Sequence, residues 1–183
     1  MDTIIMFGVG IIFFGLFYWI ITFNSIVKTD VKVNEAESGI DVALSKRYST
    51  LTNLYKVVGK YMDHEKEIFL KVAELRRELT VSSSISQKAQ LDERLNELHS
   101  KMSIIVEAYP ELKADSVVRE LQEAIIDAED HLQAARRAYN ANVSILNQKL
   151  LMFPSSLVAN AMNKKQRKFY EANELEKENV IYE

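Results

Sequence analysis

Apolar residues recur along most of this chain at steps of three and four residues, the spacing that places them on one face of an α-helix. The first such series consists of Ile40, Leu44, Leu51, Leu54 and Val58. It predicts a helix over about 29–61 with one apolar face. Strict alternation of apolar and polar residues, the pattern of a half-buried strand, has little support anywhere in the sequence.

A second helix is predicted to begin near Asp63, a residue type that suits an N-cap. The serines of the stretch TVSSSISQ weaken or interrupt this helix, because serine side chains compete for backbone hydrogen bonds. Beyond them, apolar residues follow the 4-3-4-3 spacing of a heptad seam from Leu91 to Ile105. Pro110 ends the helix at or before Tyr109, since the residue before a proline avoids the helical conformation.

The longest apolar stripe follows a predicted turn in the stretch YPELKADS, where Asp115 or Ser116 can cap the next helix. Its members are Leu121, Ile125, Ala128, Leu132, Ala135, Tyr139, Val143, Leu146, Leu150 and Phe153. Pro154 ends this third helix, and a weaker fourth helix is predicted to carry Leu157, Ala161, Met162, Phe169 and Tyr170. Long amphipathic helices with short connections pack as an antiparallel bundle. We therefore predict an all-α fold with three long helices and a shorter fourth.

The N-terminal stretch from Ile4 to Phe23 differs from the rest because it is apolar on every face and carries no charge. Its length matches a helix that crosses a bilayer, and Tyr18 and Trp19 near its end suit the headgroup region. The basic segment and small-residue cleavage site of a signal peptide are absent. The sequence predicts three parts, namely a single transmembrane anchor over 1–24, a helical bundle over 25–172 and a charged, loose C-terminal tail over 173–183.

Basic residues near the predicted anchor indicate its orientation. No Lys or Arg precedes the apolar stretch, whereas Lys28 and Lys32 follow it. Basic residues that flank a span tend to stay in the cytoplasm. We therefore expect a short N-terminus outside the cell and the bundle in the cytoplasm.

Composition excludes several classes of function. Five glycines and two prolines in 183 residues are too few for a many-stranded fold, and a net charge of −3 argues against a nucleic-acid binder with a large basic surface. With no cysteine, disulfides, thiol catalysis and zinc–cysteine sites are excluded. Neither His64, His99 nor His131 follows a glutamate at the Glu-x-x-His spacing of carboxylate-bridged metal sites. We expect no catalytic residue, metal or cofactor, and a structural role for His64.

Four stretches give this sequence a distributed resemblance to a known family. They are NEAESGIDVALSKRYSTLTNLYKVVGKYMDHE (34–65), YPELKA (109–114), ELQEAIIDAEDHLQAARRAYNANVSILNQKLLMFP (120–154) and FYEA (169–172). Together with the N-terminal apolar stretch they span nearly the whole chain, in the order found in the LemA family, which the sequence resembles. The family usually carries Trp at the position of Glu37, Pro at the position of Thr52 and a Gly-Phe pair near Met162.

The resemblance implies a membrane protein of the bacterial inner membrane with an antiparallel bundle of long helices. It implies no established enzymatic activity. Members of the family are thought to act alongside other membrane proteins, including membrane proteases.

Polar residues on or beside the predicted apolar faces are the candidates for a functional site. At about 100° per residue, Arg47 falls near the centre of the first helix's apolar face. A polar stripe lies beside the apolar face of the third helix, and we predict that it joins Arg47 in a polar ladder formed by Arg47, Asn53, Glu129, Arg136, Asn140 and Asn147. Glu129 should pair with Arg136 or Arg47, because an unpaired buried charge costs several kcal/mol, and the asparagines should bond across helices. The ladder is expected to hold the helices in register, with a partner-binding groove as the alternative.

A basic cluster near the C-terminus comprises Lys164, Lys165, Arg167 and Lys168, a composition that could suit anionic lipid. If the first helix leaves the membrane, the second returns and the third ascends, Pro154 lies at the distal tip. The cluster then lies far from the membrane, so we expect a solvated helical face instead.

Two hypotheses for the function follow. The first is a non-enzymatic, membrane-anchored bundle that recruits, scaffolds or steadies other membrane proteins, such as a membrane protease complex. The alternative is a membrane-organising protein that acts as a homo-oligomer. Copies would then meet through an exposed heptad edge from Leu91 to Ile105, or through Gly8 and Gly15 in the span.

Overall fold

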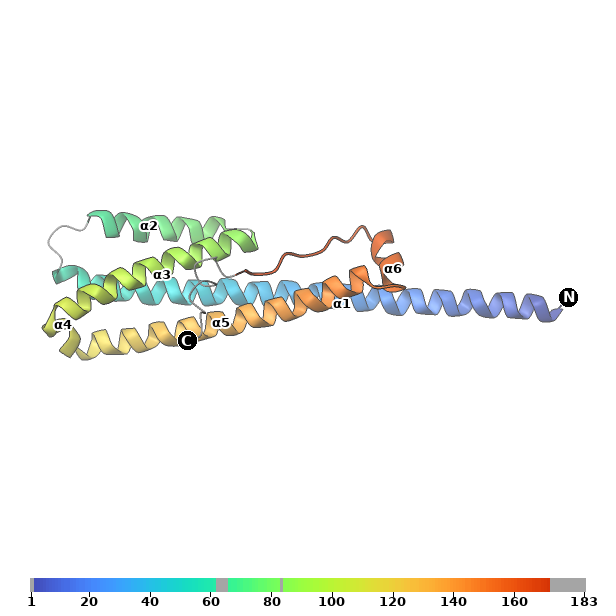
Figure 1. Ribbon diagram of the computed structural model, residues 1–183, viewed down its shortest axis with the longest axis horizontal. Helices are drawn as coiled ribbons and strands as arrows, with labels where there is room; N and C mark the ends of the chain where they lie inside the picture. Colours follow the sequence, from blue (N-terminus) through green and yellow to red (C-terminus); the bar gives the residue numbers. More distant parts are fainter. Residues whose placement is uncertain (1, 62–65, 83, 172–183) are drawn as a thin grey trace, which may run out of the picture.

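The computed structural model describes residues 2–61, 66–82 and 84–171, and every regular element in these ranges is helical. In chain order the elements are α1 (Asp2–Val58), the 3-10 helix η1 (Gly59–Tyr61), α2 (Lys66–Val81), α3 (Ile85–Ala108), α4 (Pro110–Ala114), α5 (Ser116–Leu151) and α6 (Ser155–Ala161). They form an elongated bundle in which α5 lies along α1, with α2 and α3 at the end away from the N-terminus (Figure 1). The predicted all-α bundle is confirmed.

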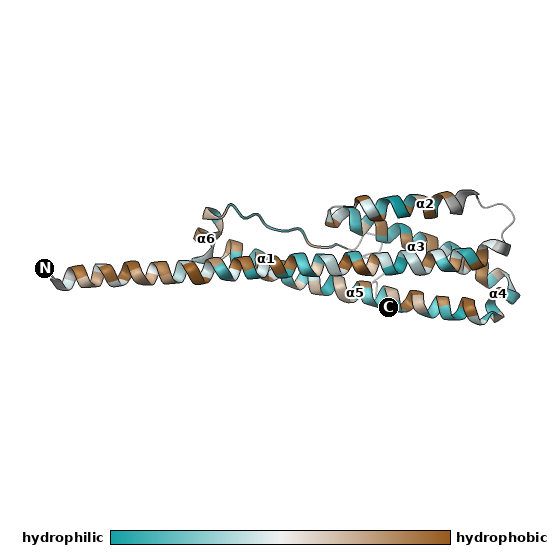
Figure 2. Ribbon diagram, turned by 180° about the vertical axis from the view of Figure 1, so that it is seen from behind, coloured by the Kyte–Doolittle hydropathy of each residue, from teal (hydrophilic) through white to brown (hydrophobic). Residues whose placement is uncertain are grey.

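Helix α1 joins the apolar N-terminal stretch to the bundle without a break. The sequence predicted a helix starting at about 29, whereas a single helix runs through both regions. The sequence of α1 contains no proline to kink it. Most large apolar side chains from Ile5 to Ile21, which we call the uncovered segment, are exposed, and burial begins at Thr22 and Ile26. Figure 2 shows this apolar end of α1 extending beyond the other helices.

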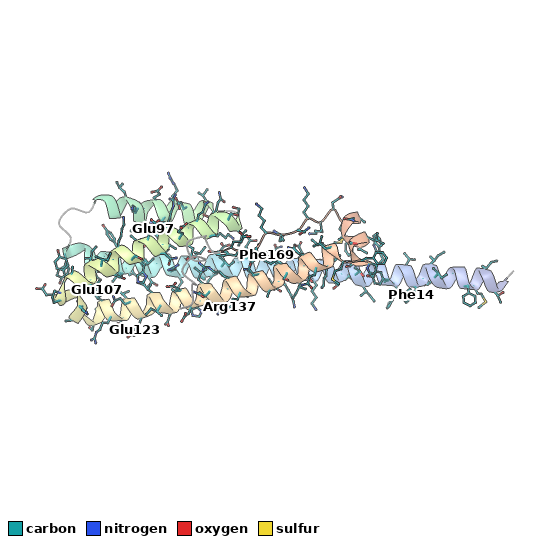
Figure 3. All side chains as sticks on the ribbon, viewed as in Figure 1. Phe14, Glu97, Glu107, Glu123, Arg137 and Phe169 are labelled. Atoms are coloured by element: carbon teal, nitrogen blue, oxygen red, sulfur yellow. The ribbon has the colours of Figure 1, made fainter. Side chains whose placement is uncertain are left out.

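The uncovered segment agrees in position with the predicted membrane anchor. Phe14, for example, projects from it with 74% of its surface exposed (Figure 3). Within the described residues, α1 is the one helix that is long and apolar enough to cross a membrane, judged by length and composition. The domain boundaries at 24 and 172 remain predictions. Asp63, His64 and the tail over 173–183 lie outside the described residues.

A reversal between α2 and α3 replaces the predicted second helix with two antiparallel helices. The serine-rich stretch interrupts the helix, and Ser84 begins α3 with a capping box. The Ser84 hydroxyl accepts a hydrogen bond from the Gln87 amide at 3.3 Å, and Oε1 of Gln87 accepts one from the Ser84 amide at 3.1 Å. As a result α2 runs back along the bundle and α3 runs out again (Figure 1).

This additional reversal inverts the direction of α5. With the two long helices α2 and α3 between α1 and α5, instead of one, α5 runs from the distal tip back toward the uncovered segment. An ion pair between Arg47 and Glu129 (3.6 Å) and a hydrogen bond from Lys149 Nζ to Ser25 Oγ (2.8 Å) fix its antiparallel register against α1. The prediction that Pro154 lies at the distal tip was therefore wrong.

The distal tip is built largely as predicted. Helix α3 ends at Ala108, before Pro110. Asp115 caps α5, since its carboxylate accepts hydrogen bonds from the amides of Val117 at 2.7 Å and Val118 at 3.4 Å. The predicted turn also contains the short helix α4, which Pro110 begins at a position where the missing N–H leaves no hydrogen bond unmade.

The predicted fourth helix ends early. Helix α6 stops at Ala161, and Asn163 adopts a left-handed φ of 52°, a conformation typical of the residue that follows a helix C-cap. Residues 164–171, which we call the C-terminal segment, then run along the bundle without regular secondary structure (Figure 1). Phe169 and Tyr170 lie in this segment instead of on a helix (Phe169 is labelled in Figure 3), and Tyr170 is buried while Phe169 is exposed.

The heptad seam of α3 faces the core. Leu91, Leu95, Leu98 and Met102 are all at most 3% exposed. Helix α3 packs against both α1 and α2, because the serine break folds α2 back over it. The prediction that this seam forms an exposed edge was wrong.

Candidate functional site

A charged group enters the core on the buried face of α1. Residues spaced by seven along this face are buried, and they are Ile26, Val33, Ile40, Arg47 and Leu54. Arg47 interrupts an otherwise aliphatic series, and only 1% of its surface is exposed. The helical wheel of α1 therefore placed Arg47 correctly on the buried face. Because a buried charge is costly without a partner, the Arg47 guanidinium requires partners inside the bundle.

Asp92 of α3 is the carboxylate that two arginines share. It forms one ion pair with Arg47 and another with Arg136 of α5, and its side chain is 3% exposed. Asn96, one turn further along α3, accepts a hydrogen bond from Arg47. Glu129 reaches Arg47 from the outer side at 3.6 Å and is 40% exposed. We call Arg47, Asp92, Glu129 and Arg136 the charge cluster, in which two positive groups face two negative groups.

Tyr170 of the C-terminal segment closes one side of the charge cluster. Its hydroxyl lies 3.4 Å from Oδ2 of Asp92 and 3.4 Å from the carbonyl oxygen of Lys88. The Arg136 guanidinium lies 4.8 Å from the centre of the Tyr170 ring, a cation–π geometry. The Tyr170 ring thus covers the charge cluster, and the Tyr170 hydroxyl attaches this ring to α3.

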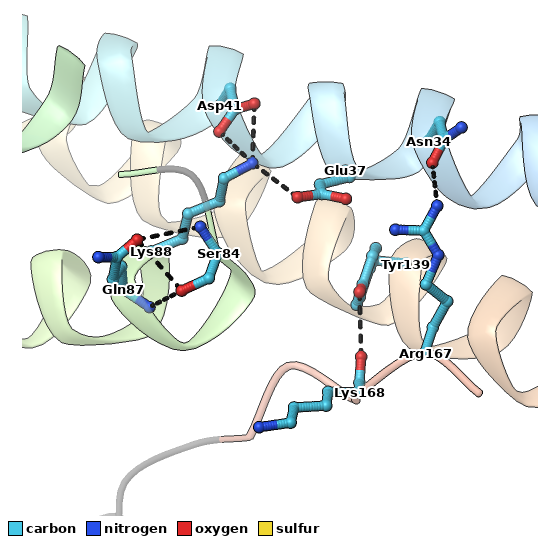
Figure 4. A network of polar contacts seen from close by, with 9 residues as sticks. All are labelled: Asn34, Glu37, Asp41, Ser84, Gln87, Lys88, Tyr139, Arg167 and Lys168. Atoms are coloured by element: carbon cyan, nitrogen blue, oxygen red, sulfur yellow. Dashed lines mark hydrogen bonds and ion pairs between the residues drawn. The ribbon is translucent and has the colours of Figure 1, made fainter. Parts of the chain in front are cut away.

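A second buried cation lies one turn before Asp92. Nζ of Lys88 is 3.0 Å from Oε1 of Glu37 and 2.8 Å from Oδ1 of Asp41, both on α1 (Figure 4). Burial alone would lower the pKa of Lys88, but the hydrogen bonds to Asp41 and Glu37 outweigh it and hold the pKa above its ordinary value. Lys88 is therefore a stable ammonium that ties α3 to α1.

Two asparagines of α5 hold the backbone of the C-terminal segment. Nδ2 of Asn140 donates to the carbonyl of Tyr170 at 2.9 Å, and Oδ1 accepts from the Tyr170 amide at 2.8 Å. Asn147 does the same for Arg167, with both distances 2.9 Å. The asparagines thus do not bond across helices as predicted, because the C-terminal segment lies beside this stripe of α5.

Further contacts attach the same segment to α1 and α5. The Tyr139 hydroxyl donates to the Lys168 carbonyl at 3.0 Å (Figure 4), and burial raises the pKa of Tyr139. Lys164 and Arg167 pair with Asp30 of α1 at 2.5 Å and 3.2 Å. Burial raises the pKa of Asp30, but these two cations lower it more, so it lies below its ordinary value. The predicted solvated helical face was therefore wrong in part, because these residues are not helical and Lys164 and Arg167 are paired, whereas Lys165 and Lys168 are exposed.

Asn53 and His99 take no part in the bonds described above. Asn53 is exposed and accepts a 3.4 Å hydrogen bond from Lys56 on its own helix, so the structure does not bring it to the charge cluster. His99 is half-buried, and burial, followed by the positive charge of Arg47, lowers its pKa. In the ranges that the structure describes, no three His, Asp or Glu side chains are grouped in a way that could hold a metal ion.

The sequence did carry a signal for the partners that α3 contributes. Lys88, Asp92 and Asn96 are four residues apart and therefore form a polar stripe beside the apolar seam of α3. The helical wheel that identified the stripe on α5 would have identified this one too. Tyr170 had no such signal, because a helical wheel assigns it to a helix that has already ended.

The charge cluster suits a structural task. One polar layer in an apolar seam disfavours every helix register that would leave its charges unpaired. Arg47 and Asp92 are almost fully buried, and Asn140 and Asn147 are bonded to the chain's own backbone. A partner could bond the Asn140 and Asn147 amides only in place of the C-terminal segment.

Comparison with known proteins assigns the chain to a family. The model of the LemA family matches residues 36–182, so the chain belongs to the LemA family. Protein LemA of Metamycoplasma hominis is 23% identical over 169 residues, which cover 91% of this chain and 77% of the relative. The charge cluster and both asparagines lie within the matched region, and the predicted family resemblance is confirmed.

Proposed function

We propose that this member of the LemA family is a single-pass membrane protein whose helical bundle recruits, scaffolds or steadies other membrane proteins and performs no catalysis itself. The observation that carries this proposal is the continuity of α1 from the uncovered segment into the bundle. If the uncovered segment crosses the bilayer, no hinge separates membrane from bundle. A bundle held in this way would present its surface at a fixed height and direction to neighbouring membrane proteins.

The proposed location is the bacterial inner membrane, with the N-terminus outside and the bundle in the cytoplasm. Lys28 and Lys32 follow the uncovered segment directly. The fold brings Lys149 and Lys164 to the same end of the bundle through contacts with Ser25 and Asp30. Basic residues on one side of a span favour the cytoplasm for that side.

Site-specific photo-crosslinking in intact cells tests the recruiting role. A photoreactive amino acid would replace Tyr109 or Ile126, which are 41% and 58% exposed on the outer half of the bundle, and Leu98 in the core would serve as the buried control. We expect defined adducts with other membrane proteins from the exposed positions and none from Leu98. Repeated recovery of the uncrosslinked chain from all exposed positions would contradict the proposal.

Self-assembly is the second proposal, and one observation favours it. A Cβ added to Gly8 or Gly15 would meet nothing within 4 Å, so this part of α1 has an open face of small residues seven apart. Such residues allow transmembrane helices to approach closely. Coexpression of two differently tagged copies distinguishes the proposals, because adducts that contain both tags indicate a homo-oligomer. A particle that stays monomeric in detergent at every concentration would exclude it.

A further inference from the structure

An apolar patch is exposed where α5 turns into α6. Four large side chains gather there, and they are Leu151 (62% exposed), Met152 (60%), Phe153 (79%) and Leu157 (58%). We call them the elbow patch. The buried face of α5 ends at Leu150, so the patch adds nothing to the described core. Contiguous exposed apolar side chains commonly mark a surface that contacts a partner or a membrane.

The elbow patch lies level with the end of the uncovered segment. Antiparallel helices with equal rise per residue keep their register, so the contacts of Glu129 with Arg47 and of Lys149 with Ser25 place Phe153 beside residues 21–23 of α1. Helix α6 packs against both α1 and α5. Figures 1 and 2 both show it beside α1 where the other helices stop covering it.

Lysines surround the α1 side of the patch. Lys28 and Lys32 are exposed on the next turns of α1, and Lys165 is exposed after α6. Nζ of Lys149 is 2.8 Å from Ser25 Oγ and 2.6 Å from Thr29 Oγ1. Burial, followed by the charges of Lys32 and Lys28, lowers the pKa of Lys149. Asp30 lies among these lysines and pairs with Lys164 and Arg167, and Glu35 follows Lys32 by one turn on the side away from the uncovered segment.

We propose that the elbow patch is a second membrane contact, which inserts into the leaflet from which α1 emerges while the surrounding lysines bind anionic phospholipid headgroups. Apolar side chains below a row of basic residues are the arrangement by which interfacial helices bind anionic bilayers. The inference rests on the proposed function, because it places the uncovered segment in the bilayer.

A lipid surface fits the patch better than a second copy of the chain does. The patch continues the apolar surface of α1 at the height where that surface ends, and the flanking charge is positive. Since α1 already tethers the bundle, the patch meets the bilayer at high effective concentration and needs little affinity of its own. Two contacts would also limit the tilt of α1, and of the bundle that moves with it, relative to the bilayer.

The absence of cysteine from the sequence allows a direct test. Single cysteines introduced as Phe153→Cys and Leu157→Cys would carry an environment-sensitive NBD fluorophore in the full chain, reconstituted into phosphatidylcholine vesicles with and without phosphatidylglycerol. Phe13→Cys in the uncovered segment and Ile126→Cys on the distal bundle serve as matched exposed controls. Phospholipids with a nitroxide at a shallow position report contact of the elbow with the bilayer by quenching, and phospholipids with a nitroxide deep in the acyl chain do so for Phe13→Cys.

We expect blue-shifted emission and loss of intensity through nitroxide quenching at both elbow positions and at Phe13→Cys, with emission typical of water at Ile126→Cys. Emission typical of water at the elbow together with a quenched Phe13→Cys would overturn this inference and leave the membrane anchor intact. If Phe13→Cys also gave aqueous emission, the proposed anchor itself would fail.

If a second copy of the chain covered the patch, the result would differ. The blue shift would disappear when the protein is diluted in lipid, and nitroxide lipids would not quench the emission. That result would also overturn the inference. Phosphatidylglycerol is expected to increase the quenching at the elbow, and the double variant Lys28→Gln/Lys32→Gln should lose this increase. Equal quenching in both kinds of vesicle would refute the role assigned to the lysines.

Discussion

Replacing Asp92 by asparagine should strongly destabilise the bundle. The substitution keeps the shape of the side chain but removes the charge that two arginines share. Arg47 is 1% exposed and Arg136 is 18% exposed, so water solvates neither guanidinium well. Removing one partner of a buried ion pair costs about 3–5 kcal/mol.

The remaining contacts reduce this cost only in part. Glu129 lies 3.6 Å from Arg47 but is 40% exposed, so solvent screens its charge. Arg136 keeps its contact with the Tyr170 ring, which contributes about 0.5–2 kcal/mol in the variant and in the natural chain alike. We therefore expect Asp92→Asn to lower the free energy of unfolding by about 3–5 kcal/mol, a large share of the roughly 5–15 kcal/mol typical of a folded domain.

Urea unfolding of the full chain in detergent micelles, followed by circular dichroism at the helical band, measures this loss as a shift in midpoint at constant slope. Arg94→Gln is the matched control, because Arg94 is 49% exposed and pairs with Glu74 and Glu78 on the surface. Its loss should stay below about 1 kcal/mol. A loss for Asp92→Asn no larger than that of Arg94→Gln would refute the view that the buried charges depend on one another.

Three further outcomes are expected from other parts of the fold. Asn140→Ala and Asn147→Ala each remove two hydrogen bonds to the C-terminal segment and should cost about 1–3 kcal/mol, measured as faster amide hydrogen exchange of that segment. Asn142→Ala, whose amide bonds a carbonyl of its own helix, should leave that exchange unchanged. Asp115→Ala should lower the free energy of unfolding by about 0.5–2 kcal/mol through loss of the α5 N-cap, measured as a shift of the urea midpoint. The pKa of Asp30 is lowered in the folded chain, so its stabilising contribution is complete above its ordinary pKa of about 3.9 and is lost as the pH falls below that value. A spin label on the C-terminal segment should therefore gain mobility on acidification, and Asp30→Asn should abolish the pH dependence.

The helix ends at the distal turn were predictable because local chemistry fixes them. Pro110 and Asp115 mark the distal turn by backbone sterics and capping, and both act within a few residues of their place in the sequence. The burial of Arg47 was predictable for the same reason, since the wheel position of one residue requires only a regular helix.

The path of the chain was not predicted, because it depended on a single loop. The serines of TVSSSISQ could either weaken one helix or separate two, which left the number of chain reversals open. That number decides whether α5 runs toward the uncovered segment or away from it. The capping box of Ser84 and Gln87 is visible in the sequence and favours the break. Once the break is accepted, Pro154 moves from the distal tip to the end of the uncovered segment, and the basic residues that follow move with it.

The reversed direction of α5 also changes the role of Asn140 and Asn147. Because α5 runs back toward the uncovered segment, the stripe with Asn140 and Asn147 lies beside the C-terminal segment. Each asparagine amide hydrogen-bonds to the backbone of that segment and not to a side chain. That segment starts after α6, level with the end of the uncovered segment, and reaches the charge cluster through Tyr170, whose hydroxyl lies 3.4 Å from Asp92. The elbow patch and the charge cluster are thus joined by a stretch of chain that α5 holds at two points.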